Sequence, residues 1–111
     1  MFEKDMNVGY LLDFYGDILP ERKRSVMDMY YNEDFSLAEI AAEIGISRQG
    51  VRDIIKKSEE ELFFYEEKLG LAKKLKSAIE SIDRLEKTTA ELSLPDEFFS
   101  EFSELKQIIS Q

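Results

Sequence analysis

The chain has 111 residues, 43% of them apolar, which is enough for one small domain or a small domain with a helical extension. It contains no cysteine, which excludes disulfides and thiol chemistry and fits a reducing cytoplasm. Histidine is also absent, so the commonest general base and metal ligand is missing. The formal net charge of −9 argues against a general coating of nucleic acid but permits a local basic face.

No targeting or membrane segment is predicted. The first residues lead into no long apolar run, so they do not resemble a signal peptide. The longest apolar and aromatic run is Leu62 to Tyr65, whereas a membrane span needs about 20 residues. We therefore expect a cytoplasmic protein without a membrane span.

Apolar residues recur at helical spacing from the N-terminus onward. A first buried helical face is predicted for Val8, Leu11, Leu12, Tyr15, Ile18 and Leu19. Pro20 predicts the start of a second helix, because proline is favoured at the first helical position. The apolar face of this second helix comprises Val26, Met27 and Tyr30, and a polar turn over residues 32–34 ends it.

The middle of the chain has the sharpest local signals. Ser36 and Glu39 have the spacing of a capping box, so a helix is predicted to begin at Leu37. Gly45 predicts the end of this helix, because glycine adopts the left-handed conformation of a helix C-terminus without steric cost. Ser47 is then the predicted N-cap of the next helix.

Two helices that meet at Gly45 have the residue pattern of a helix-turn-helix. The predicted inner faces comprise Ile40, Ala41 and Ile44 on the first helix and Val51 and Ile54 on the second, with Ile46 filling the corner. The second helix is expected to run to about residue 69. Along it a near-heptad apolar seam is formed by Val51, Ile55, Ser58, Leu62, Tyr65 and Leu69.

The second helix supplies the candidate nucleic-acid-binding residues, which are Arg48, Gln49, Arg52, Lys56 and Lys57. The first turn of such a helix enters the major groove, where Arg pairs with guanine and Gln with adenine. Two interpretations stay open at this point. Either these side chains contact nucleic acid, or the motif is structural or docks a protein, its cations being solvated and the following acidic residues 59–61 repelling phosphates.

A C-terminal helical hairpin is predicted after Gly70. Its first helix has a stripe formed by Leu71, Leu75, Ala78, Ile82, Leu85, Thr89 and Leu92, and residues 93–95 interrupt the pattern. Its last helix is strongly apolar, with Phe98, Phe99, Phe102, Leu105, Ile108 and Ile109. One wide apolar face of this helix is formed by Phe98, Phe102, Leu105 and Ile109. Because such a face must be buried, we predict a homodimer formed through the region after Leu62. The predicted domains are residues 1–69 and 70–111.

Nothing in the sequence predicts an enzyme. The carboxylates of residues 59–61 and 66–67 are consecutive on a helix, so they point in different directions and form a solvated acidic face. No catalytic residue, metal site or cofactor is predicted. The aromatic residues 63–65 are interpreted as core or interface rather than as a surface for stacking bases.

Part of the chain resembles the C-terminal promoter-reading domain of sigma factors. The resemblance is in residues 19–22, 30–31, 36–41, 45–48 and 51–52. It implies an all-α fold, a sigma-factor-like bundle of three to four helices with a long recognition helix. It also implies that Arg48, Gln49 and Arg52 read bases. Gln49 stands where many sigma factors have an acidic residue, so the same promoter element is not implied.

The whole chain is still more similar to the YlxM family of helix-turn-helix proteins. The similarity is clearest in residues 7–16 (NVGYLLDFYG) and 62–69 (LFFYEEKL) and covers residues 3 to about 76. Members are encoded beside genes of the signal recognition particle and its receptor. The resemblance implies a DNA-binding regulatory protein that takes part in that pathway. The alternative it implies is an accessory that binds the particle's protein or RNA, with a helix-turn-helix that does not bind DNA.

Overall fold

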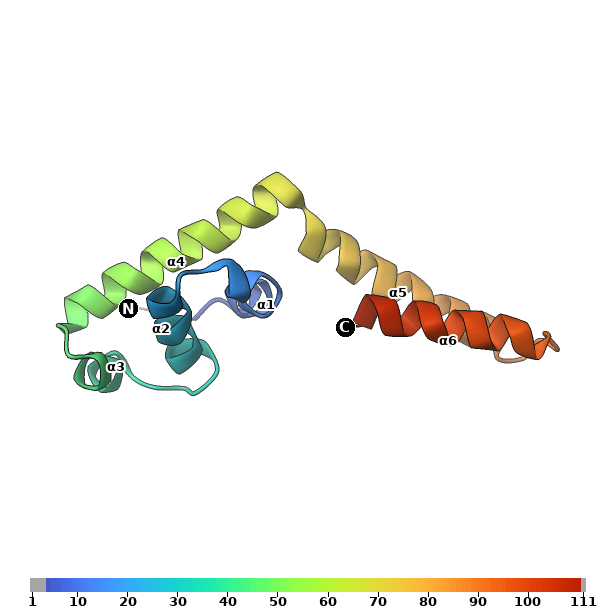
Figure 1. The fold of residues 1–111 in the computed structure, drawn as a ribbon, viewed down its shortest axis with the longest axis horizontal. Helices are drawn as coiled ribbons and strands as arrows, with labels where there is room; N and C mark the ends of the chain where they lie inside the picture. The colour runs from blue at the N-terminus through green and yellow to red at the C-terminus, as the bar shows by residue number, and fades with distance from the viewer. Residues whose placement is uncertain (1–3, 111) are drawn as a thin grey trace. The chain divides into compact units, whose positions relative to one another are not determined.

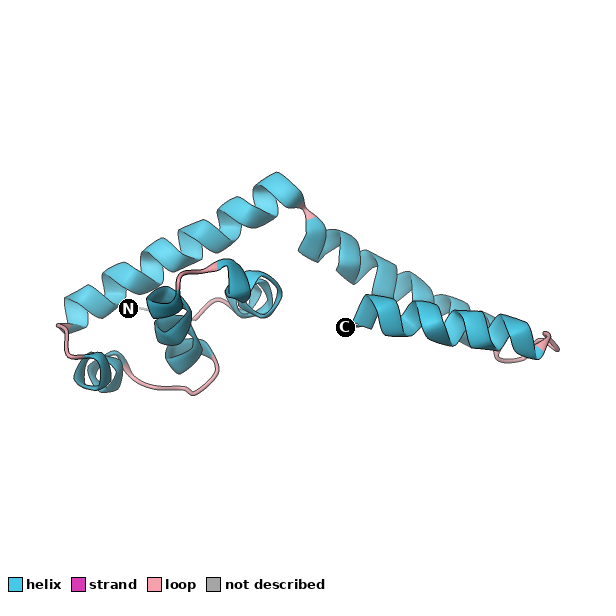
Figure 2. Ribbon diagram, viewed as in Figure 1, coloured by secondary structure: helices cyan, strands magenta, loops and turns pink. Residues whose placement is uncertain are grey.

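The computed structural model describes residues 4–110, and this part of the chain consists of helices and connecting loops, with no strand (Figures 1 and 2). The elements in chain order are α1 (Met6–Tyr15), the 3-10 turn η1 (Gly16–Ile18), α2 (Glu21–Tyr31), α3 (Leu37–Ile44), α4 (Arg48–Leu69), α5 (Leu71–Thr89) and α6 (Asp96–Ser110). The predicted all-α class is confirmed. Residues 1–3 and 111, the ends of the two predicted domains, lie outside the described residues.

The chain divides into two compact units at Gly70. The first contains α1 to α4 and is called the N-terminal unit here. The second contains α5 and α6, which run back along one another in opposite directions, and is called the C-terminal hairpin (Figure 1). No helix in residues 4–110 combines the length and the apolarity needed to cross a bilayer.

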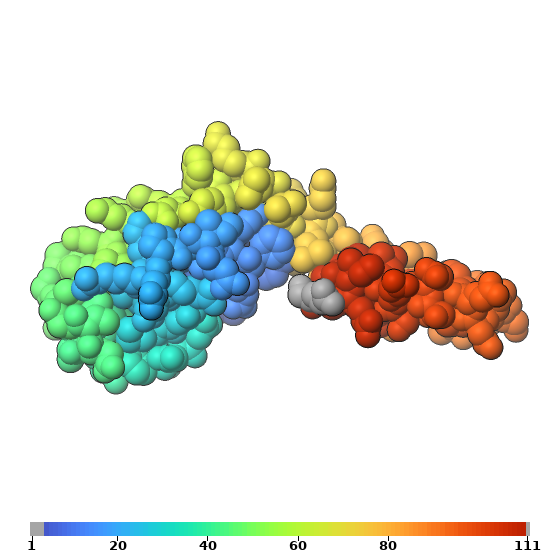
Figure 3. Space-filling model, in the orientation of Figure 1, coloured from blue at the N-terminus to red at the C-terminus, as the bar shows by residue number. Residues whose placement is uncertain are grey.

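Helix α4 organises the N-terminal unit, because α1, α2 and α3 all pack against it. In the space-filling view these segments, blue to green, adjoin without a gap (Figure 3). Val51, Ile55, Ser58 and Leu62 are all 0% exposed, so this part of the predicted seam is correct. The Ser58 hydroxyl donates to the Ile54 carbonyl over 2.7 Å, which satisfies a polar group that would otherwise be costly to bury.

Some predicted core positions are wrong. Ile18 is 54% exposed, because α1 ends at Tyr15 and the tighter 3-10 turn breaks the helical spacing. Leu69 is also 54% exposed, at the last residue of α4. Ile44 and Ile54 are only half-buried, whereas Ile55, the next residue of α4, is fully enclosed. Pro20 is the N-cap of α2 rather than its first residue.

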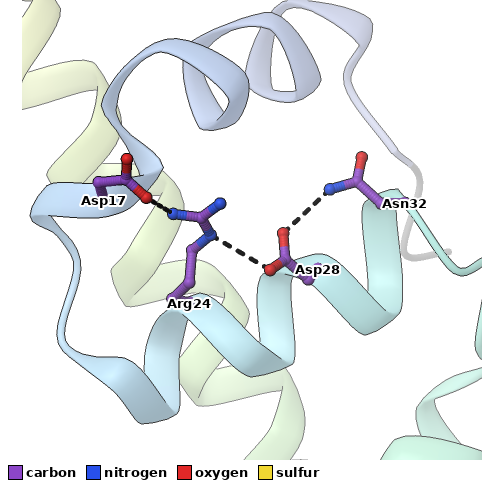
Figure 4. A network of polar contacts seen from close by, with 4 residues as sticks. All are labelled: Asp17, Arg24, Asp28 and Asn32. Carbon is purple, nitrogen blue, oxygen red and sulfur yellow. Dashed lines mark hydrogen bonds and ion pairs between the residues drawn. The ribbon is translucent and has the colours of Figure 1, made fainter.

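Arg24 joins η1 to α2 in a polar network at the surface (Figure 4). Its guanidinium forms an ion pair with Asp17 of η1 and donates through Nε to Asp28 over 3.2 Å. The second oxygen of Asp28 accepts from the Asn32 side-chain amide over 2.9 Å. The hydrogen bond with Asp17 is the main cause that raises the Arg24 pKa. The network links η1 to α2 at the surface.

The C-terminal hairpin is much less enclosed. Among residues 71–110 only Ala72 and Ile82 of α5 are buried, and α6 has no buried residue. Leu71 and Leu85 are 45% and 51% exposed, and Leu92, 53% exposed, lies beyond the end of α5. These three positions of the predicted stripe are therefore not covered within the chain itself. The reason is that α5 has one partner helix in this unit, and a pair of helices encloses only the line where they meet.

Candidate nucleic-acid interface

A capping box fixes the start of α3. The Ser36 Oγ accepts from the Glu39 backbone N–H over 3.1 Å, and the Glu39 carboxylate accepts from the Ser36 N–H over 2.9 Å. Two N–H groups that the helix leaves unpaired are thereby satisfied. The bond from the Ser36 backbone also holds the pKa of Glu39 below its usual range. This part of the prediction is confirmed.

The turn between α3 and α4 is set by Gly45, which has φ 75° and ψ 35°. The N–H groups of Gly45 and Ile46 both donate to the Ala41 carbonyl, over 2.9 and 3.1 Å, and so close the end of α3. Ser47 then caps α4, its Oγ accepting from the Gly50 N–H over 2.9 Å. Gly45 therefore ends α3 and Ser47 caps α4, as the sequence predicts.

The turn aims the start of α4 away from the core. Ile40 and Val51 are 0% exposed at the inner sides of α3 and α4, and the two helices pack together. All five predicted site residues are exposed, namely Arg48, Gln49, Arg52, Lys56 and Lys57. Among them Arg48, Arg52 and Lys56 follow one another at intervals of four residues, which places them along one side of α4. Lys57, next to Lys56, lies about 100° further round.

Two neighbours affect these side chains. The Gln49 amide donates to Asp53 Oδ1 over 3.0 Å, so an acidic residue of the same helix engages the candidate adenine-reading group. The spacing of four residues could have revealed this pair from the sequence. Arg52 lies within electrostatic range of the Tyr30 hydroxyl, whose pKa is raised mainly by burial. Arg52 is therefore positioned beside the end of α2.

The acidic second half of α4 differs from the prediction of a purely solvated face. Glu59 accepts a hydrogen bond from Tyr31, Glu61 forms an ion pair with Lys23, and Glu66 accepts from Tyr15. Burial, and secondarily the bond to Glu59, raises the Tyr31 pKa above its ordinary value. These carboxylates therefore fasten α1 and α2 to α4. Sequence reasoning missed the pairs, because the partners are 28 to 51 residues apart.

Carboxylates of the described residues do not converge on a common centre either. No group of three or more Asp or Glu side chains in residues 4–110 is arranged to hold a metal ion.

Two helices joined by a tight turn at Gly45, the second of them long and exposed along its outer side, define a helix-turn-helix protein. A family model described as "Putative helix-turn-helix protein, YlxM / p13 like" matches residues 2–108. The chain therefore belongs to this family, UPF0122, as its resemblance to the YlxM proteins predicted.

Relatives in the same family are similar over most of the chain. The UPF0122 protein BH2485 of Halalkalibacterium halodurans is 40% identical over 90% of this chain and 92% of its own length. The UPF0122 protein lin1916 of Listeria innocua is 41% identical over 87% and 88%. The UPF0122 protein TTE1463 of Caldanaerobacter subterraneus is 48% identical over 68% of this chain, and the match spans 64% of that relative, just under two thirds.

Proposed function

We propose that this protein is a DNA-binding regulator that uses α4 as a recognition helix. The observation that supports the proposal best is the exposed basic side of α4, on which Arg48, Arg52 and Lys56 follow one another. Residues 48–57 contain four basic side chains and one acidic one, in a chain whose net charge is −9. We call Arg48, Arg52 and Lys56 the basic line of α4. Because the rest of the protein is acidic, phosphates should be attracted mainly to this part of α4.

Each side chain then has a distinct role. Arg48 and Gln49, in the first turn of α4, are placed to reach base edges, as the first turn of a recognition helix does. Arg52 and Lys56, further along the same side, are placed to meet phosphates or bases. Gln49 must release Asp53 in order to pair with adenine, so DNA competes with a contact inside the helix. The acidic residues from Glu59 onward limit the contact to the start of α4.

The experiment begins with selection of a preferred duplex from a pool with a randomised central segment. Binding to that duplex is then measured by fluorescence anisotropy at several salt concentrations. We expect Arg48→Ala to lose about 1–3 kcal/mol and to relax preference at one base position. Affinity should also fall steeply with salt, because bound cations release counterions from the DNA.

Lys68→Ala is the matched control, because Lys68 is an exposed cation of the same helix outside the basic line. It removes the same charge and should leave base preference unchanged. If no sequence is enriched and the triple variant Arg48→Ala, Arg52→Ala, Lys56→Ala binds DNA as the wild type does, the proposal is wrong.

A second candidate function is supported by the other half of α4. Phe63 and Phe64 are 41% and 54% exposed there, among acidic residues. An exposed aromatic pair suits a protein partner better than a phosphate backbone. We propose as this alternative an accessory of the signal recognition particle, binding its protein or RNA component, a partner taken from the family resemblance. Retention on the particle's GTPase, with and without its RNA, tests it, and Phe64→Ser should abolish retention. No retention in either case would eliminate it.

A further inference from the structure

The last helix of the chain is amphipathic but uncovered in the C-terminal hairpin. No residue of α6 is buried, although Phe98, Leu105 and Ile108 are large and apolar and are 37%, 43% and 64% exposed. Isolated helices of this length are marginal in water, so most of their stability has to come from an apolar face that packs on something. A unit of about 40 residues with so little buried surface is expected to need further association.

The contacts of α6 distinguish the two sides of the hairpin. Lys106 forms an ion pair with Glu86 of α5, and Phe99 lines the same 300 Å³ depression as both of them. Phe98 stacks on Phe102, with ring centroids 5.9 Å apart. By helical spacing Phe102 lies between Phe99 and Phe98, so Phe98 lies toward the side of α6 away from Phe99.

Helical spacing assigns the remaining apolar residues to that other side. On α6, Phe98, Leu105 and Ile108 lie on the flank away from Phe99 and Lys106. On α5, Leu85 lies on the flank away from Glu86. Because Glu86 and Lys106 meet on one side, these four residues share the opposite side of the hairpin. They form what we call the open apolar face, consisting of Leu85, Phe98, Leu105 and Ile108.

The two ends of the hairpin have opposite charge. On the side of the open apolar face, the first turns of α5 contain Lys74 and the first turns of α6 contain Glu97 and Glu101, whereas Lys76 and Asp96 lie on the opposite flank by the same helical spacing. Since the two helices run in opposite directions, the start of α5 with its cation lies at the open end of the hairpin and the start of α6 with its two carboxylates at the loop end (Figure 1). A surface with this polarity is complementary to a copy of itself turned end for end.

We propose that the open apolar face binds the same face of a second copy of this chain, with the two hairpins antiparallel in a four-helix bundle. Twofold symmetry places the basic end of each hairpin beside the acidic end of the other, while the apolar residues meet in the middle. The inference rests on the C-terminal hairpin alone, so it stands or falls independently of DNA binding.

The mass of the full chain in solution tests the proposal, by sedimentation equilibrium over a range of concentrations. We expect the wild type to have twice the 13.0 kDa of one chain. Leu105→Glu should weaken self-association at least about tenfold, because it places a charge in the middle of the interface. Phe99→Glu is the matched control, since Phe99 is 42% exposed, almost as much as Leu105, on the opposite flank of α6. It should remain dimeric.

Charge reversal tests the antiparallel arrangement without touching an apolar side chain. Lys74→Glu should weaken the dimer about two- to fivefold, and adding Glu97→Lys should restore it. Circular dichroism of these variants reports whether the helices persist. A wild-type chain that stays monomeric would overturn the proposal, as would equal dimerisation of the Leu105→Glu and Phe99→Glu variants. If the double reversal does not restore association, the antiparallel arrangement is wrong.

Discussion

The two units of this protein use the same kind of amphipathic helix and enclose it to very different degrees. In the N-terminal unit α4 has four residues that are completely buried, because three other helices pack around it. In the C-terminal hairpin α6 has none, because α5 is its one partner in that unit. The difference shows that an apolar face on a helix predicts a packing partner. It does not indicate whether that partner is another helix of the same chain or a different molecule.

The largest expected effect comes from the enclosed unit. Leu62→Ala should lower the free energy of unfolding by about 2–5 kcal/mol, because Leu62 is 0% exposed and its removal leaves a cavity. Leu105→Ala, in the open hairpin, should cost less than about 1 kcal/mol in dilute solution, because the side chain is 43% exposed. Urea unfolding of both variants, followed by circular dichroism, measures the two effects. Equal losses would remove the distinction between the units.

A smaller effect is expected from the turn of the helix-turn-helix. Gly45→Ala should destabilise the N-terminal unit by roughly 1–2 kcal/mol, because the left-handed backbone at this position is unfavourable for alanine. The added Cβ itself would meet no atom within 4 Å, so the effect comes from the backbone alone. Gly9→Ala is the control, because Gly9 is helical and its added Cβ makes an ordinary contact 3.9 Å from Tyr31. That variant should be up to about 1 kcal/mol more stable than the wild type. Thermal unfolding distinguishes the two, and a stabilising Gly45→Ala would contradict the backbone argument.

The smallest expected effect concerns the capping box of α3. Ser36→Ala should cost about 1 kcal/mol, because the Glu39 N–H loses its acceptor. Unfolding in urea at neutral pH measures it. Glu43→Ala, on the same helix but outside the box, is the control and should have a much smaller effect.

The capping box also has a pH dependence with a defined sign. The pKa of Glu39 is lowered in the folded chain, so its contribution is present above the ordinary glutamate value of 4.5 and is lost as the pH falls through the lowered pKa. The stability difference between wild type and Glu39→Ala should therefore be full at neutral pH and vanish in acid. A difference that persists in strong acid would show that the carboxylate is not the group responsible.

Local signals predicted the helix-turn-helix well. Ser36, Gly45 and Ser47 act on residues no more than four positions away, so their roles can be read from spacing alone. The buried part of α4 followed from its period for the same reason. The prediction for Ile18 is wrong because the α-helix ends at Tyr15. The spacing of apolar residues does not indicate at which residue a helix ends.

Contacts between distant segments could not be predicted in the same way. Tyr15 donates to Glu66 across 51 residues, and the acidic half of α4 gave no sign of which carboxylates would find partners. The apolar side of α6 shows a second limit of reasoning from sequence. The residue pattern of α6 correctly predicted a helix with an apolar side, but nothing in that pattern indicates how many neighbouring helices the fold brings to it.

The two proposals together assign a separate task to each unit, with DNA binding at the start of α4 and self-association through the C-terminal hairpin. Amide hydrogen exchange of the full chain, with and without a duplex at low salt, tests this assignment most directly. The account predicts slower exchange over residues 47–57 on binding and unchanged exchange over residues 98–108. Unchanged exchange at the start of α4 in the presence of bound duplex would contradict it.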